Sequence, residues 1–302
     1  MSTRISAVQS HPDPVLIIGN FDGVHTGHRA VIRAAGEHGP VVAVTFNPHP
    51  LQVLRPDRAP RLLTSVEERR GLLLDSGVAD VVEIPFTAEV SQWSPAEFID
   101  RALLPLHPSR IVVGENFRFG HKAAGTPSTL SELAAGRYTV EVLPLRAGVS
   151  STEIRRAVAD GDVAQAHRLL GRPFRHSETV VEGHRRGRGL GFPTANLPVN
   201  PHRVAPADGV YAGWLTRLDE ADAVRLPAAI SVGTNPTFDD VLATVVEGHV
   251  LDRTDLELYG VPVAVDFIDR LRGNVRFDGL DALITQMTAD VEDVRRRLTA
   301  AG

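Results

Sequence analysis

Two histidines and three glycines crowd into residues 19–28, which read GNFDGVHTGH and follow the apolar run VLII. Glycines between a buried strand and a helix let the backbone turn sharply and bring N–H groups to an anion at the helix N-terminus. His25 and His28 lie three positions apart, so both rings can face one ligand. Three readings stay open: a phosphate site, a metal site, and a surface turn with two solvated histidines. The metal site is the weakest, because HxxH lacks the glutamate and the i, i+4 spacing of HExxH.

The composition excludes several classes of protein and of ligand site. A chain of 302 residues is long enough for two domains, and 43% hydrophobic with 23% charged residues is typical of a globular protein. The net charge of −5 gives no bulk attraction to nucleic acid or an anionic membrane, so an anionic ligand needs a local site. The chain has no cysteine, which excludes thiolate metal sites and cysteine nucleophiles. Without a signal peptide or an apolar run of about 20 residues, we expect a cytoplasmic protein.

The first half of the chain alternates apolar runs with amphipathic segments. The runs are 15–18, 41–46, 81–86, 111–114 and 138–145, and helices are expected near 26–37, 65–76, 94–104 and 126–136. Apolar strands separated by helices indicate a parallel sheet covered on both faces. Ligands bind such sheets beyond the C-terminal ends of the strands, where GNFDGVHTGH, FNPHP and VGENFRFG all lie.

The pattern changes near residue 150. Residues 150–174 predict two short helices, with Ser151 or Thr152 as a possible cap of the first and Gly161 as the break between them. Short β-like runs separated by Gly, Pro, Asn and Asp follow, and they indicate an antiparallel barrel or sandwich. Residues 280–298 are amphipathic and end in three arginines, which favours a C-terminal helix.

The pattern GxFDGxHxGH resembles the nucleotidylyltransferase signature of the bacterial bifunctional riboflavin kinase/FAD synthetases, in which the two histidines bind the triphosphate of ATP. The resemblance extends to NPHP at 47–50, to VVGENFRFGHKAAG at 112–125 and to SSTEIR at 150–155. It implies catalytic roles for His28 and Arg155. It also implies that ATP or flavin is contacted by Gly19, Phe21, Asp22, Gly23, His25, His28, Asn47, Pro48, Pro50, Gly114, Asn116, Phe119, Ser151, Thr152 and Arg155.

Two of these motifs have details of their own. For Asn116 and Phe119, a loop asparagine and a core phenylalanine are the plain alternatives to the flavin-facing wall that the family implies. Asn47 stands where many relatives have aspartate, and both are short polar residues suited to a turn at a strand end. The departure therefore leaves the implied site intact.

Residues 183–196 read GHRRGRGLGFPTAN, a basic glycine-rich loop followed by two side chains that carry oxygen. In a β segment, Thr194 and Asn196 share one face, and Mg²⁺ prefers oxygen ligands. Taken alone, the stretch is more typical of a solvated loop and a turn. However, GRxLGFPTAN resembles the riboflavin kinase module of the same family, in which the Thr and Asn hold the Mg²⁺–nucleotide. Further contacts that the module implies are Gly183, Arg186, Gly187, Gly189, Asn235 and Arg272.

Glu247 aligns with the catalytic base of that module. Such a carboxylate takes the proton of the flavin 5′-hydroxyl as the γ-phosphoryl group transfers, whereas the plain alternative is an exposed glutamate on a strand. Many relatives have GDGRGR where this chain has GHRRGR. His184 and Arg185 should make the loop stiffer and more basic, so we expect an altered nucleotide affinity without loss of activity.

The resemblance implies a fold and a function for the whole chain. An α/β nucleotidyltransferase-type, Rossmann-like FMN adenylyltransferase domain spans 1–158, a linker helix 159–172, and an antiparallel β-barrel riboflavin kinase domain with a C-terminal helix 173–302. The enzyme would phosphorylate riboflavin to FMN and adenylylate FMN to FAD, with ATP as co-substrate and Mg²⁺ as cofactor. Nucleic acid and membrane are not expected partners, and the sequence predicts no oligomeric state. The rivals are a paralogue with one active module or a flavin-analogue substrate, and a non-catalytic flavin-binding protein.

Overall fold

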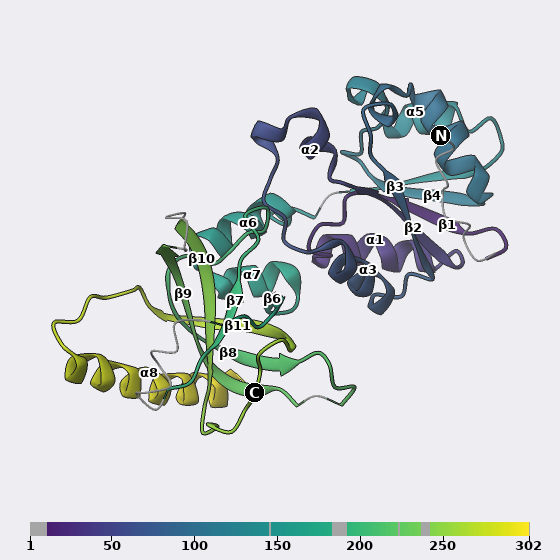
Figure 1. Cartoon of the computed structure of the whole chain (residues 1–302). Helices are drawn as coiled ribbons and strands as arrows, with labels where there is room; N and C mark the ends of the chain where they lie inside the picture. Colours follow the sequence, from purple (N-terminus) through teal and green to yellow (C-terminus); the bar gives the residue numbers. More distant parts are fainter. Residues whose placement is uncertain (1–10, 145, 183–191, 223, 237–241, 302) are drawn as a thin grey trace. The chain divides into compact units, whose positions relative to one another are not determined.

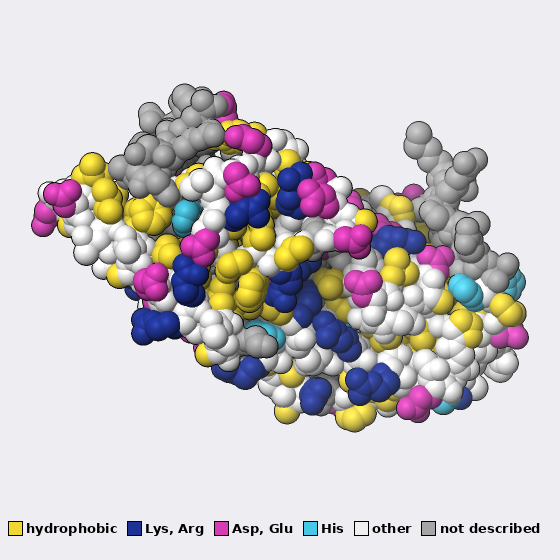
Figure 2. All heavy atoms as spheres, turned by 90° about the horizontal axis from the view of Figure 1, so that it is seen from below, with side chains coloured by type: hydrophobic (Ala, Val, Ile, Leu, Met, Phe, Trp, Pro, Cys, Tyr) yellow, Lys and Arg dark blue, Asp and Glu magenta, His cyan; other side chains and the backbone are white. Residues whose placement is uncertain are grey.

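The computed structural model describes residues 11–144, 146–182, 192–222, 224–236 and 242–301 (Figure 1). The chain divides into two compact units, Met1–Ser151 and Thr152–Gly302, and each unit has its own sheet. None of the helices in the described ranges combines the length and hydropathy that crossing a bilayer requires. The face in Figure 2 carries acidic as well as basic side chains, as expected for a chain of small net charge.

The first unit is built on a five-stranded parallel sheet with the strand order β3-β2-β1-β4-β5. The strands are β1 (Val15–Ile18), β2 (Val41–Asn47), β3 (Asp80–Pro85), β4 (Arg110–Gly114) and β5 (Thr139–Leu143). All four residues of the central strand β1 are buried, and they alternate between two separate cores. The apolar runs therefore form the parallel sheet, covered on both faces, that the sequence predicts.

Helices supply the other side of each core (Figure 1). On one face, α1 (Thr26–Gly36) and α3 (Val66–Asp75) bury Ile32 and Leu73 against the sheet. On the other face, Phe98 of α4 (Pro95–Phe98) and Leu130 of α5 (Pro127–Glu132) are buried. Helix α1 is the first helix after the central strand β1, and the first candidate site begins at the loop between them.

The predicted helix over 94–104 is interrupted. After α4 the chain continues as a π-helical turn, η3 (Ile99–Leu103), and then as a 3₁₀ turn, η4 (Leu104–Leu106). Pro105 lacks the N–H that a continued α-helix would use, and the short 3₁₀ turn that contains it ends at Leu106. Other short helical elements are α2 (Pro50–Leu54), η1 (Pro56–Arg58), η2 (Val90–Gln92) and η5 (His121–Ala123).

Two short helices follow the first sheet, as the sequence predicts: α6 (Ser151–Ala159) and α7 (Val163–Leu170). Asp162 caps α7 by accepting a hydrogen bond from the backbone N–H three residues on. Gly161 separates the two helices with a φ of 79°, and its position leaves no room for a side chain, because a Cβ would lie 2.9 Å from the Tyr211 hydroxyl.

The second unit is an antiparallel six-stranded sheet with the order β6-β11-β8-β9-β10-β7. The strands are β6 (Phe174–Thr179), β7 (Ala195–Pro198), β8 (Gly209–Arg217), β9 (Leu226–Pro236), β10 (Leu242–Val250) and β11 (Pro262–Arg272). The two edge strands approach each other: His176 Nε2 lies 3.2 Å from the Pro198 carbonyl, and the Val181 N–H donates to the Asn196 carbonyl at 2.9 Å. The sheet is therefore a nearly closed barrel, which confirms the predicted architecture.

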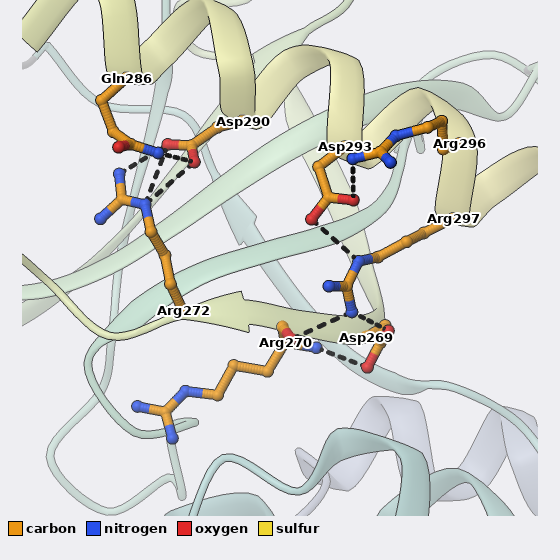
Figure 3. A network of polar contacts seen from close by, with 8 residues as sticks. All are labelled: Asp269, Arg270, Arg272, Gln286, Asp290, Asp293, Arg296 and Arg297. Atoms are coloured by element: carbon orange, nitrogen blue, oxygen red, sulfur yellow. Dashed lines mark hydrogen bonds and ion pairs between the residues drawn. The ribbon is translucent and has the colours of Figure 1, made fainter.

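The C-terminal helix α8 (Leu280–Ala301) packs on this barrel, and Val294 and Leu298 are buried against Ala212 of β8 and against Leu251. Ion pairs also fix α8 to β11 (Figure 3). Arg297 contacts Asp269 of β11, and Arg272 of β11 binds Asp290 of α8. The predicted C-terminal helix is confirmed and extends to residue 301.

A buried histidine lies where the edge strands β6 and β7 approach each other, and it should make the stability of the protein depend on pH. His176 is 3% exposed, and burial, with Arg203 nearby, lowers the pKa of His176 from 6.5 to about 4. Between these pH values the unfolded chain binds more protons than the folded chain, so the free energy of unfolding falls as the pH drops from 6.5 to 4, by up to about 3 kcal/mol. His176→Gln keeps a donor for the Pro198 carbonyl without titrating. We expect a flatter dependence of Tm on pH for this variant, and identical curves would contradict the assignment.

Candidate functional sites

The loop between β1 and α1 has an unusual backbone. The Gly19 N–H donates to the Val44 carbonyl at 3.1 Å, and the chain then takes positive φ at Phe21 (48°), Gly23 (82°) and Val24 (40°). A β-branched residue at positive φ is a genuine outlier, and such strain clusters at functional sites. The surroundings must therefore hold this loop in shape.

His25 and His28 form a stacked pair at the start of α1. Their ring centroids lie 3.6 Å apart with an interplanar angle of 14°, and His25 Nδ1 accepts a hydrogen bond from the His28 N–H at 3.2 Å as the helix N-cap. Gly27 makes room for this arrangement, because a Cβ there would lie 3.1 Å from two atoms of the His25 ring. The two imidazole rings therefore lie against each other, and the His25 ring also caps α1.

Burial, and secondarily His25, holds the pKa of His28 well below its usual value of 6.5. A neutral imidazole therefore predominates at pH 7, which favours hydrogen bonding over ionic attraction as its means of holding a ligand. His28 Nδ1 is buried and has no hydrogen-bond partner within the described residues. Because buried polar atoms in proteins are normally paired, this nitrogen marks a place for a polar ligand or water.

Asp22 is a buried residue that ties the loop to the segment before α3. Its carboxylate is 2% exposed and accepts hydrogen bonds from the backbone N–H groups of Leu63 and Thr64 at 3.0 and 3.1 Å, and from the Thr64 hydroxyl at 3.1 Å. Ser151, the first residue of α6, donates its hydroxyl to the Asp22 carbonyl at 2.9 Å. Through these hydrogen bonds, the side chains of Asp22 and Ser151 hold the loop in its conformation.

Thr152 and Arg155 follow Ser151 on α6 and belong to the second unit. Several predicted residues of the first unit lie at or just after strand ends: Gly114 closes β4, and Asn116 is exposed in the turn after it. Asn47 closes β2 and is joined to Pro48 by a cis peptide bond. These positions agree with a ligand edge at the C-terminal ends of the strands.

An aromatic cavity of about 420 Å³ opens at the same end of the sheet. Its lining includes Phe46, Phe86, Phe98 and Phe119, together with Pro50 at the start of α2. The Phe98 and Phe119 centroids lie 5.6 Å apart, and those of Phe46 and Phe86 lie 5.7 Å apart. The volume and the aromatic lining are those of a site for a planar organic ligand.

The charged residues on this cavity have one sign. Arg55, Arg118 and Lys122 line it, and its described lining contains no aspartate or glutamate. All three side chains belong to exposed residues. A ligand that combines an aromatic ring with an anionic group matches this lining on both counts.

The second unit brings Glu247 and Asn196 together. They are directly opposite in the antiparallel register of β10 and β7, and Ser231 of β9 faces Glu247 on its other side. Directly opposed residues project from the same face of a sheet, with Cβ atoms about 5 Å apart. Glu247 therefore shares a face with the amide predicted to bind metal and nucleotide.

Thr194 directly precedes β7, and with Asn196 it lines a small cavity. Arg253, Glu257 and Tyr259 line the same cavity. Hydroxyl, amide and carboxylate oxygens are the donor types that Mg²⁺ takes, with nucleotide phosphates completing its coordination. Within the described residues no three His, Asp or Glu side chains gather in a metal-binding group.

Arg272 joins the barrel to α8, and its predicted contact with nucleotide stays a prediction. Its guanidinium pairs with Asp290 of α8, with Nε 2.9 Å from Oδ1 and Nη2 2.6 Å from Oδ2 (Figure 3). Gln286 also donates to Asp290 at 2.9 Å. The pair joins β11 to the helix. The backbone of Asn235 lies in β9, whereas Gly183, His184, Arg185, Arg186, Gly187 and Gly189 lie outside the described residues.

The two halves of the chain match two different protein families. Residues 7–154 match the FAD synthetase family, and residues 170–298 match the riboflavin kinase family. Proteins called bifunctional riboflavin kinase/FMN adenylyltransferase from Listeria monocytogenes and Escherichia coli are each 36% identical to this chain. The first alignment covers 93% of this chain and 91% of the relative, and the second 91% and 90%. The chain belongs to the bifunctional riboflavin kinase/FMN adenylyltransferase family.

A solved structure shares the fold of nearly the whole chain. A crystal structure titled macrolide-efflux protein from Streptococcus pneumoniae matches with a TM-score of 0.86 and 31% identity, over 97% of both chains. Each family match also contains one of the two sites: His25 and His28 fall in the FAD synthetase match, and Glu247 falls in the riboflavin kinase match. The resemblance of both motif sets to the riboflavin kinase/FMN adenylyltransferase family is confirmed.

Sequence reasoning missed residues that fold back onto the first site. Thr64 contacts Gly23 of the loop that precedes α1 from 41 positions further along the chain, and Arg69 contacts Asn20 of this loop from 49 positions further along. The only local signal is the capping box of Ser65 and Glu68, which marks the start of α3. That signal locates the helix but does not reveal what its neighbours touch.

Proposed function

We propose that this chain makes FAD from riboflavin in two steps: phosphorylation of riboflavin to FMN by ATP, then transfer of AMP from a second ATP to FMN. The observation that carries the proposal is that each matched half contains a polar cluster suited to its own reaction. One has the stacked histidines at a helix N-terminus. The other has a carboxylate directly opposite an amide. Since both steps consume ATP, the cytoplasm is the proposed compartment.

In the kinase step, the Glu247 carboxylate accepts the proton of the riboflavin 5′-hydroxyl, and the hydroxyl oxygen forms a bond to the γ-phosphorus of ATP. The bond from this phosphorus to the β–γ bridging oxygen breaks, and ADP leaves with the electron pair. Thr194 and Asn196 are the proposed ligands of Mg²⁺ together with the nucleotide phosphates. When bound, Mg²⁺ would neutralise charge on the transferring phosphoryl group.

In the adenylylation step, a phosphate oxygen of FMN attacks the α-phosphorus of ATP, and pyrophosphate leaves with the electrons of the broken bond. No protein nucleophile is needed. His28 and the N-terminal amides of α1 are the proposed groups that hold the triphosphate and the developing charge. A role for Arg155 stays a prediction from the family motif. As a neutral ring, His28 would hold the triphosphate by donating a hydrogen bond from one nitrogen.

The aromatic cavity is the proposed site of the flavin ring, and its three cations are the proposed contacts of the FMN phosphate. Replacing Lys122 by methionine should raise KM for FMN about tenfold, because one charge-assisted contact is lost. Riboflavin phosphorylation should not change. Arg58→Gln is the matched control, because Arg58 is exposed and does not line the cavity. An unchanged KM for FMN in Lys122→Met would show that Lys122 does not contact the FMN phosphate.

Separate assays of the pure chain test the proposal against its rivals. Riboflavin with Mg²⁺–ATP should yield FMN and then FAD, and FMN with Mg²⁺–ATP should yield FAD and pyrophosphate. FMN that accumulates without FAD would mean that only the kinase module is active. Flavin binding without any product would mean a non-catalytic flavin-binding protein.

A further inference from the structure

Arg69 is an arginine inside the core of the first unit. It stands on α3 and is 3% exposed. Its Nη1 donates to the Asn20 carbonyl at 3.1 Å, and its Nη2 donates to the Phe46 carbonyl at 3.2 Å. Asn20 lies in the loop after β1, and Phe46 lies near the end of β2, so one guanidinium joins the ends of two neighbouring strands.

The charge of Arg69 is not cancelled by direct contact. Within the described part of the chain, no carboxylate forms an ion pair with it. Burial lowers the pKa of Arg69, while Asp22, Glu83 and Glu67 act in the opposite direction. Arginine nevertheless stays protonated in proteins. A buried charge is costly, and an apolar side chain often packs as well or better, so stability alone does not account for an arginine here.

The segment that precedes Arg69 holds the same loop from a second side. The Thr64 hydroxyl accepts a hydrogen bond from the Gly23 N–H at 3.2 Å and donates to Asp22 at 3.1 Å. Phe21 and Val24 flank the two contacted residues, and their positive φ values are unfavourable for residues with side chains. Residues 63–69 thus act as a clamp that imposes the shape of the loop.

We propose that Arg69 is a positioning residue for adenylyl transfer. It fixes the loop between β1 and α1 through the Asn20 carbonyl, and so sets the place of the His25–His28 pair. It also puts a permanent positive charge behind the proposed triphosphate site. The inference rests on the proposed function of this loop, and Arg69 itself touches no substrate.

Lysine is the informative replacement because it keeps the charge but lacks the planar fork that reaches two carbonyls in fixed directions. In Arg69→Lys we expect KM for ATP to rise and kcat to fall in FAD formation, with kcat/KM about 10–100-fold lower, as small misplacements of binding groups produce. Riboflavin phosphorylation by the same sample should match the wild type, since its site lies in the other unit.

Arg70→Lys is the matched control. Arg70 is the next residue of α3, and it donates to the Val81 carbonyl at 2.8 Å and to Asp80 at 3.1 Å without touching the loop. A loss of folded protein would lower the apparent kcat but leave KM for ATP unchanged in the fraction that remains folded. Arg69→Lys with an unchanged KM for ATP therefore contradicts the proposal.

Thr64→Val provides a second variant, because it keeps the side-chain shape and removes the hydroxyl that links Gly23 to Asp22. We expect a several-fold rise in KM for ATP. If Arg69→Lys and Thr64→Val both form FAD with wild-type KM and kcat, the clamp does not position the site. A wild-type chain that forms no FAD from FMN would instead overturn the proposed function, and this assay is made first.

Discussion

Replacing Glu247 by glutamine should lower the rate of riboflavin phosphorylation by about 10²–10⁴-fold, the usual effect of removing a general base. Glutamine keeps the size of the side chain opposite Asn196 but cannot accept the proton of the 5′-hydroxyl. Conversion of added FMN to FAD should continue at the wild-type rate. Chromatographic separation of flavins, after incubation with riboflavin or with FMN, measures both reactions in the same preparation.

A glutamate elsewhere in the second unit controls for the loss of a carboxylate. The Glu292 side chain lies on α8 and is 65% exposed, so Glu292→Gln should leave both activities unchanged. A Glu247→Gln enzyme with wild-type kinase activity would show that this carboxylate takes no proton in the reaction. It would also strengthen the alternative of a strand glutamate without a catalytic task.

His28→Ala should have the complementary effect. We expect FAD formation from FMN to slow by about 10²–10³-fold, because a preorganised hydrogen-bond donor to the transition state is lost. Riboflavin phosphorylation should be unaffected. Since the pKa of His28 is well below 6.5, the neutral ring is already the main form at pH 7. The wild-type rate should therefore show no loss attributable to His28 as the pH rises from 6.5 to 8.

His38→Asn is the control for a histidine in the same unit. His38 follows the C-terminal end of α1, about 16 Å from the helix N-terminus, and pairs with Glu141 at 2.9 Å. This variant should keep wild-type adenylyltransferase activity. Equal rates for His28→Ala and the wild type would exclude His28 from the reaction.

Much of the fold follows from local patterns. Runs such as 15–18 and 41–46 are apolar at nearly every position, which is typical of strands buried on both faces. Glycines and prolines between short β-like runs likewise indicate the antiparallel barrel of the second unit. The break after Phe98 escaped the pattern, because the π-helical turn keeps apolar residues at nearly helical spacing.

The geometry of the candidate sites was harder to predict from the sequence, because it depends on contacts between residues that are distant in the chain. The spacing of His25 and His28 predicts a shared direction, but the stacking of their rings depends on the bare backbone at Gly27. Asp22 reads as a ligand contact in the motif, yet its carboxylate binds backbone 41 and 42 residues away. No local pattern records such a partner.

The measurement that tests the central claim most directly follows two labels from ATP into FAD. The pure chain is given riboflavin, Mg²⁺ and ATP labelled at the γ-phosphorus in one reaction and at the α-phosphorus in another. If one chain performs both steps, the γ label appears first in FMN and then in FAD, while the α label appears in FAD and never in FMN. FAD without the γ label, or γ-labelled FMN that never becomes FAD, would contradict the account.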